Sequence, residues 1–117
     1  MPRMPKRRDA VATQKPVVYF IQAESGGPIK IGKTTKSIRK RLGSLQTGNV
    51  SKLIVLATTG KHTEEYLHER FKAWRISGEW FRPVVTLLQW IQLNAVVTTD
   101  GHRHLAKVSV WNEANHE

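Results

Sequence analysis

Apolar residues in the first half of the chain gather in short runs whose spacing predicts strands. Residues 17–22 (V-V-Y-F-I-Q) are β-branched and aromatic, and residues 29–32 continue this character after the turn-forming sequence E-S-G-G-P at 24–28. Two such runs joined by a short glycine-containing turn predict a β-hairpin. Residues 53–59 (L-I-V-L-A-T-T) carry no charge, which predicts a third strand that is buried on both faces.

Apolar residues spaced three and four positions apart predict three helices. The first spans 36–46 and ends at a glycine-containing stop. The second begins after Thr63, whose hydroxyl can cap it, and extends to Ser77-Gly78. The third spans 84–97, with Pro83 at its first position, where a missing N–H is tolerated.

The remaining segments complete the predicted fold. Residues 79–82 are either a short strand or irregular, Asp100-Gly101 signals a turn, and residues 105–111 alternate like an edge strand. This order of elements predicts an α+β fold in which a small, largely antiparallel sheet is flanked by helices. Along the chain we expect a flexible basic arm at 1–15, one domain at 16–99, and an edge strand with a tail at 100–117.

The composition excludes several classes of protein. A chain of 117 residues has room for one domain, and its 39% hydrophobic residues suffice for a packed core. With no cysteine, a disulfide framework, a thiolate nucleophile and a cysteine-ligated zinc site are excluded. Polar residues interrupt the uncharged stretch 83–99, and the basic N-terminus lacks the apolar segment of a signal sequence. We therefore expect an intracellular protein with no membrane partner.

The charge of the chain favours a polyanionic partner. Nineteen lysines and arginines stand against nine acids, which gives a formal net charge of +10. The arm at 1–15 holds five basic residues and one acid, and segment 30–41 holds six basic residues and no acid. Such clusters are typical of proteins that bind nucleic acid, because they neutralise its phosphates.

Three side chains stand out within the predicted elements, each with an ordinary structural alternative. Glu64 lies at the edge of the apolar stripe of the second helix, so it is either a helix-dipole or salt-bridge partner or a site carboxylate. Arg41 either reaches over the sheet edge or covers apolar surface. Tyr19 lies in the middle of a strand, where most tyrosines are structural. Glu65 and Glu69 are expected to point into solvent.

Five sequence blocks, taken in order, carry a resemblance to a known family. They are V-V-Y-F-I, K-I-G-K-T-T, R-K-R-L-G-S-L-Q-T-G-N, E-E-Y-L-H-E-R-F and G-E-W-F. The set resembles the GIY-YIG nuclease superfamily, in particular a phage-associated branch that carries K-I-G in place of Y-I-G together with G-E-W-F. The resemblance covers residues 17–82. It implies a GIY-YIG-like fold and a divalent-metal-dependent endonuclease that hydrolyses DNA phosphodiester bonds.

The resemblance also implies roles for individual residues. Tyr19 takes the place of the tyrosine that helps to activate the attacking water, and Lys30 replaces the tyrosine of the second motif. Arg41 matches the arginine that binds the scissile phosphate, and Glu64 matches the carboxylate that holds Mg²⁺ or Mn²⁺. His68, one turn after Glu64 and on the same side, is a candidate neighbour of the site. The residues expected to follow the nucleic-acid backbone are Lys33, Lys36, Arg39 and Lys40.

Two other functions remain open from the sequence. Lys30 in place of the tyrosine suits a nucleic-acid-binding module that has lost cleavage, and the basic character also suits a protein-interaction domain of a phage or mobile element. Glu79 is expected to have a structural role, as the ion-pair partner of a basic residue such as Arg82 or as a backbone hydrogen-bond acceptor. His102 and His104 are expected to be exposed, and among the tryptophans Trp80 is the candidate for base stacking.

Overall fold

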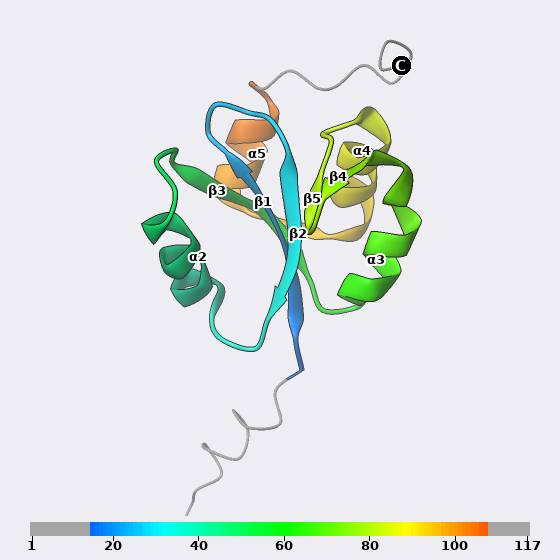
Figure 1. The fold of residues 1–117 in the computed structure, drawn as a ribbon, viewed down its shortest axis with the longest axis horizontal. Coiled ribbons are helices and arrows are strands. Elements are labelled where there is room, and N and C mark those ends of the chain that lie inside the picture. Colours follow the sequence, from blue (N-terminus) through cyan, green and yellow to red (C-terminus); the bar gives the residue numbers. More distant parts are fainter. Residues whose placement is uncertain (1–14, 108–117) are drawn as a thin grey trace, which may run out of the picture.

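The computed structural model of the chain describes residues 15–107, and these form one antiparallel sheet with helices on both faces. The described residues contain six strands in the order β4-β5-β2-β1-β3-β6 and four α-helices. Figure 1 shows helix α2 on one side of the central strands and helices α3 and α4 on the other. The α+β fold with a small antiparallel sheet, predicted from the sequence, is confirmed.

The centre of the sheet is the predicted hairpin. Strand β1 (Val17–Ala23) pairs antiparallel with β2 (Ile29–Thr34), and both Gly26 and Gly27 in the connecting turn have positive φ angles. Glycine adopts this backbone conformation without steric cost, which explains the G-G pair in the turn. Strand β3 (Leu53–Thr59) pairs with the other edge of β1 and covers the predicted range.

The two faces of β1 carry different cores because successive side chains point to opposite sides of a strand. Tyr19 and Ile21 pack under helix α2 (Ile38–Thr47), whose first turn is capped by the Ser37 hydroxyl. The other face holds the main core, which is formed with helices α3 (Glu64–Arg70) and α4 (Val85–Asn94). Its largest buried rings are Phe20, Phe71, Phe81 and Trp90.

The second predicted helix is shorter than expected. Thr63 caps it as predicted, but α3 ends at Arg70 and is followed by a 3₁₀ turn (Lys72–Trp74) and strand β4 (Arg75–Ser77). The chain then reverses at Gly78, with a φ of 54°, and enters β5 (Trp80–Phe81), which pairs with β2. Pairing of this small hairpin with the free edge of β2 therefore overrides the helical spacing of the sequence. Of the two alternatives for residues 79–82, the short strand is correct.

The third predicted helix begins and ends within its expected range. Val84 is the N-cap residue that precedes the helix, so Pro83 lies two positions before the first helical residue, Val85, rather than in its first turn. The helix ends at Asn94, and β6 (Val96–Val97) leaves it to pair with β3. Hydrogen bonding to the open edge of β3 thus replaces the last helical turn. In the described part of the chain, none of the helices is long and apolar enough to cross a membrane.

The predicted turn and edge strand at the C-terminal end are wrong in the part that the structure describes. Asp100 and Gly101 lie inside helix α5 (Thr99–Leu105), where the Thr98 hydroxyl accepts a hydrogen bond from the Gly101 N–H at 2.7 Å. Gly101 is required because a Cβ at this position would collide with the Leu56 carbonyl oxygen of β3. Leu105 ends this helix instead of opening a strand, and residues 108–111 of the predicted strand lie outside the described residues, as does the arm at 1–14.

Candidate active site

Tyr19, Gly32 and Arg41 come together on the α2 face of the sheet. Tyr19 and Gly32 are cross-strand partners, and the buried ring of Tyr19 lies where a Cβ on Gly32 would be. The glycine of K-I-G is therefore required by the tyrosine opposite it. Arg41, on the first turn of α2, donates from its Nε to the Tyr19 hydroxyl at 3.3 Å. This hydrogen bond raises the pKa of Arg41, so the guanidinium stays charged.

Arg41 lines a hollow of about 320 Å³ between β2 and α2. Besides Arg41, its wall carries the cations Lys33 and Lys36 and the hydroxyls of Thr34 and Thr35. Two of the four residues expected to follow a nucleic-acid backbone, Lys33 and Lys36, thus lie beside Arg41. The other two, Arg39 and Lys40, are exposed on α2 and are not part of this wall.

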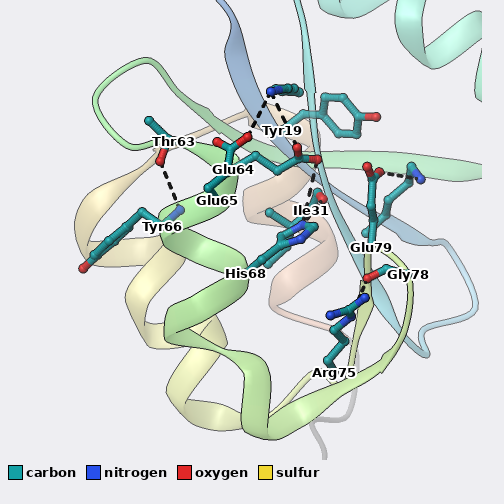
Figure 2. Close-up of polar contacts among 12 residues, drawn as sticks. Tyr19, Ile31, Thr63, Glu64, Glu65, Tyr66, His68, Arg75, Gly78 and Glu79 are labelled. Atoms are coloured by element: carbon teal, nitrogen blue, oxygen red, sulfur yellow. Dashed lines mark hydrogen bonds and ion pairs between the residues drawn. The ribbon is translucent and has the colours of Figure 1, made fainter.

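Glu64 is the first residue of α3 and points toward the sheet (Figure 2). Its side chain is 12% exposed, and the basic side chains closest to its carboxyl oxygens are Lys33, with Nζ at 4.0 Å, and His68, with Nε2 at 3.9 Å. Its Oε2 atom is buried and has no hydrogen-bond partner among the described residues. Burial, together with the nearby Glu79 carboxyl, raises the pKa of Glu64. This is an electrostatically unsatisfied carboxyl, which a cation would stabilise.

Glu64 lines a second hollow, of about 270 Å³. The cations in its wall are Lys15, Lys33 and Lys61. Because Lys33 and Pro16 line both hollows, the two are neighbours, and we call them together the basic groove. It extends from Arg41 past Lys33 to Lys61. The sequence analysis named neither Lys15 nor Lys61 as a site residue. Lys61 is three residues before Glu64 in the chain, whereas Lys15 is brought there by the fold.

Lys30 and Glu79 form an ion pair beside this groove. The Lys30 Nζ lies 2.9 Å from the Glu79 Oε1 and 5.4 Å from the centre of the Trp80 ring, which is half-buried. Burial raises the pKa of Glu79, but the hydrogen bonds with Lys30 and Glu64 outweigh it, so the net effect is a lowered pKa. The expected ion pair of Glu79 with a basic residue is therefore present, with Lys30 as a partner. Glu79 also lies nearer to the site than its expected structural role implied.

His68 lies next to Glu64, as its spacing on the helix predicts. Its Nε2 is 2.9 Å from the Ile31 carbonyl oxygen of β2, and its ring packs against Phe81 at 5.1 Å. A carbonyl accepts hydrogen bonds only, so Nε2 carries the proton in this contact. The contact fixes the ring between α3 and the sheet, and Figure 2 shows it below the Glu64 carboxyl.

His104 is a correction to the sequence analysis, which placed it in solvent. It is buried under the sheet, where its Nε2 lies 3.0 Å from the Oε1 of Gln22. Burial lowers the pKa of His104. The misplacement follows from the wrong assignment of this segment, since α5 turns the histidine toward β1. His102, in contrast, is exposed as expected.

The described residues provide few metal ligands. Within residues 15–107 there is no group of three or more His, Cys, Asp or Glu side chains that could hold a metal ion. The unpartnered Oε2 of Glu64 nevertheless fits a divalent cation, because Mg²⁺ and Mn²⁺ prefer carboxylate oxygens and keep several waters. A cation at Glu64 would complete its shell with water and substrate oxygens.

Comparison with known proteins identifies the family. No curated protein and no solved structure matches the chain significantly. The sequence profile of the T5orf172 domain matches residues 16–99, which is most of the chain. The chain therefore belongs to the T5orf172 domain family, a phage-associated domain found in endonuclease-related proteins.

Proposed function

We propose that the chain is an endonuclease that hydrolyses DNA phosphodiester bonds with the help of Mg²⁺ or Mn²⁺. The observation that carries this proposal is the buried Oε2 atom of Glu64, which lacks a hydrogen-bond partner in the described part of the chain and belongs to a residue in the wall of the basic groove. A protein that only binds nucleic acid gains nothing from a carboxylate among its lysines, because the carboxylate repels phosphate. A divalent cation held by Glu64 would turn this repulsion into attraction.

Arg41 is proposed to bind the non-bridging oxygens of the scissile phosphate. Its Nε donates to the Tyr19 hydroxyl, which leaves the two terminal nitrogens outside this hydrogen bond, and Arg41 lines the groove. A guanidinium oriented in this way can bind two phosphate oxygens at once. The Tyr19 hydroxyl still has its own proton to donate, and we propose that it orients the attacking water.

Glu64 is proposed to hold the divalent cation, with His68 next to it. When bound, the cation supplies positive charge for the oxygen that leaves when the phosphorus–oxygen bond breaks. Lys30 stands where the resemblance has a tyrosine, and its ammonium is engaged by Glu79. We therefore assign Lys30 a fixed positive charge near the phosphate rather than the role of a general base.

A nucleic-acid-binding module without cleavage is the second candidate, and the ion pair of Lys30 with Glu79 favours it. An amine committed to a carboxylate cannot replace a tyrosine hydroxyl in proton transfer, so a chain that had lost catalysis would tolerate this pair. The basic groove would then serve for phosphate binding only.

One experiment distinguishes the endonuclease from the binding module. Purified protein is incubated with supercoiled plasmid in Mg²⁺, in Mn²⁺ and in EDTA, and DNA binding is measured in parallel in EDTA. The endonuclease converts the plasmid to nicked or linear forms with either metal and leaves it intact in EDTA. Binding without any conversion in Mg²⁺ or Mn²⁺ would refute the endonuclease and support the binding module.

A further inference from the structure

Tyr66 presents an aromatic ring on the outer side of α3, close to the basic groove. The residue is 44% exposed, and its ring stacks on His62 with ring centres 5.5 Å apart and an angle of 28° between planes. Figure 2 shows Tyr66 pointing away from the sheet, on the other side of α3 from Glu64. An exposed aromatic ring that does not contribute to the core is available for a ligand.

The ring of Tyr66 is held in place without a ligand. His62 beneath it packs edge-on against Trp90, with ring centres 4.9 Å apart, and Trp90 belongs to the main core. The Tyr66 hydroxyl accepts a hydrogen bond from the Arg70 Nη1 at 3.4 Å. A ligand that stacks on this ring therefore loses little entropy in ordering it.

The surroundings of the ring favour a nucleobase over an apolar partner. His62 lines the same hollow as Glu64, Lys15 and Lys61, so the stacked pair meets the basic groove through His62. Cations beside an isolated flat ring are typical of sites where single strands bind, with phosphates on the charges and bases on the ring. A docking surface for an apolar protein segment needs a contiguous apolar patch instead.

We propose that Tyr66, backed by His62, is a stacking platform for an unpaired nucleobase next to the phosphate bound in the basic groove. The proposal rests on the proposed function in that the ligand is a nucleic acid, and it narrows the substrate to one with an unpaired base near the bound phosphate. Single strands, overhangs and bulges offer such a base. In continuous duplex DNA the bases are stacked on one another, so no base reaches the platform.

Binding of three fluorescein-labelled probes in EDTA tests the platform. The probes are a 12-nucleotide oligothymidine, the same oligonucleotide with abasic sites throughout, and a blunt duplex, each titrated by fluorescence anisotropy. Tyr66→Ala should weaken oligothymidine binding by roughly 5- to 100-fold, the range expected for loss of one stacked base. It should leave abasic and duplex binding within about twofold of the wild type, since the change removes no charge.

Two further variants separate stacking from loss of folding. Tyr66→Phe keeps the flat ring and should bind oligothymidine like the wild type, whereas Tyr66→Leu keeps apolar bulk without the ring and should behave like Tyr66→Ala. Leu93→Ala, at an 83% exposed position on α4, is the matched control and should have no effect. Thermal melts check that each variant is folded.

The outcomes distinguish the platform from the proposed nuclease. If Tyr66→Ala binds oligothymidine like the wild type, or loses abasic and duplex binding to the same extent, the platform is refuted while the nuclease stands. If oligothymidine binding depends on Tyr66 but neither oligothymidine nor plasmid is cut in Mg²⁺ or Mn²⁺, the platform is supported and the nuclease fails. A wild-type chain that binds none of the three probes would refute both.

Discussion

The Lys30 ammonium lies 2.9 Å from the Glu79 carboxylate, across the pairing of β2 with the β4–β5 hairpin. The two residues are far apart in sequence, yet both belong to blocks that carry the family resemblance. The pair joins the K-I-G and G-E-W-F blocks physically and brings a second carboxyl next to Glu64. It also gives the short hairpin an electrostatic contact with the sheet.

Glu79→Gln is predicted to lower stability and to retain cleavage. The change leaves the Lys30 ammonium, 15% exposed, without this partner. Because Glu79 is itself 39% exposed, we expect a loss of about 1 kcal/mol in the free energy of unfolding. Thermal melts should show a midpoint several degrees lower, whereas Glu69→Gln, which breaks the solvent-exposed pair with Lys72, should leave it unchanged. Loss of all cleavage in folded Glu79→Gln would make Glu79 part of the catalytic machinery.

Arg41→Ala is predicted to lose both binding and turnover. Arg41→Lys should restore little, because an ammonium lacks the planar fork that presents two parallel donors to phosphate oxygens while the Nε binds the Tyr19 hydroxyl. Arg39, two residues earlier, is exposed on the same helix and provides the control. Arg39→Ala should lower DNA affinity without changing the cleavage rate at saturating DNA. A cleavage rate that fell with Arg39→Ala and not with Arg41→Ala would show that Arg39, rather than Arg41, binds the scissile phosphate.

Nucleic-acid affinity is predicted to fall steeply with salt. Each phosphate neutralised contributes about −0.9 to the slope of log K against log salt for duplex DNA. Lys36→Gln and Lys61→Gln, at the two ends of the basic groove, should each make this slope less negative by up to about 0.9. Lys72→Gln, outside the walls of both hollows, should leave the slope unchanged. Equal effects of all three changes would argue against a defined groove.

Stability is predicted to fall in mild acid because of His104. Burial lowers the pKa of His104 in the folded chain below its usual value near 6.5, so protons bind preferentially to the unfolded chain. The stabilising contribution is complete above that value and is lost as the pH falls toward the lowered folded pKa. The melting temperature should therefore drop as the pH falls below about 6.5. The drop should be smaller in His104→Gln and unchanged in His102→Gln, since His102 is exposed.

The sequence predicted the elements whose patterns are local. Strands β1, β2 and β3 and the cap of α3 at Thr63 follow from apolar runs and a capping residue, and all are present. The elements that were wrong depend on distant partners. The second predicted helix gives way to β4 because the β4–β5 hairpin pairs with β2, and α5 forms where Gly101 can lie against Leu56.

The candidate site likewise combines residues that the sequence analysis named with residues that it did not. The contact of Tyr19 with Arg41 and the position of Glu64 beside His68 agree with the roles implied by the family resemblance, although the roles themselves stay predictions. Lys15 and the partner of Glu79 could not be found from the sequence. Their contacts form across strands and loops that only tertiary structure brings together.

Cleavage of supercoiled plasmid by Glu64→Gln, measured across a series of Mg²⁺ and Mn²⁺ concentrations, tests the central claim most directly. The matched control is Glu65→Gln, which changes the next residue of α3, 72% exposed and paired with Lys33. We predict that Glu64→Gln folds, binds DNA in EDTA at least as tightly as the wild type and cuts at no metal concentration, whereas Glu65→Gln still cuts. Cleavage by Glu64→Gln at the wild-type rate would contradict the assignment of the metal to Glu64.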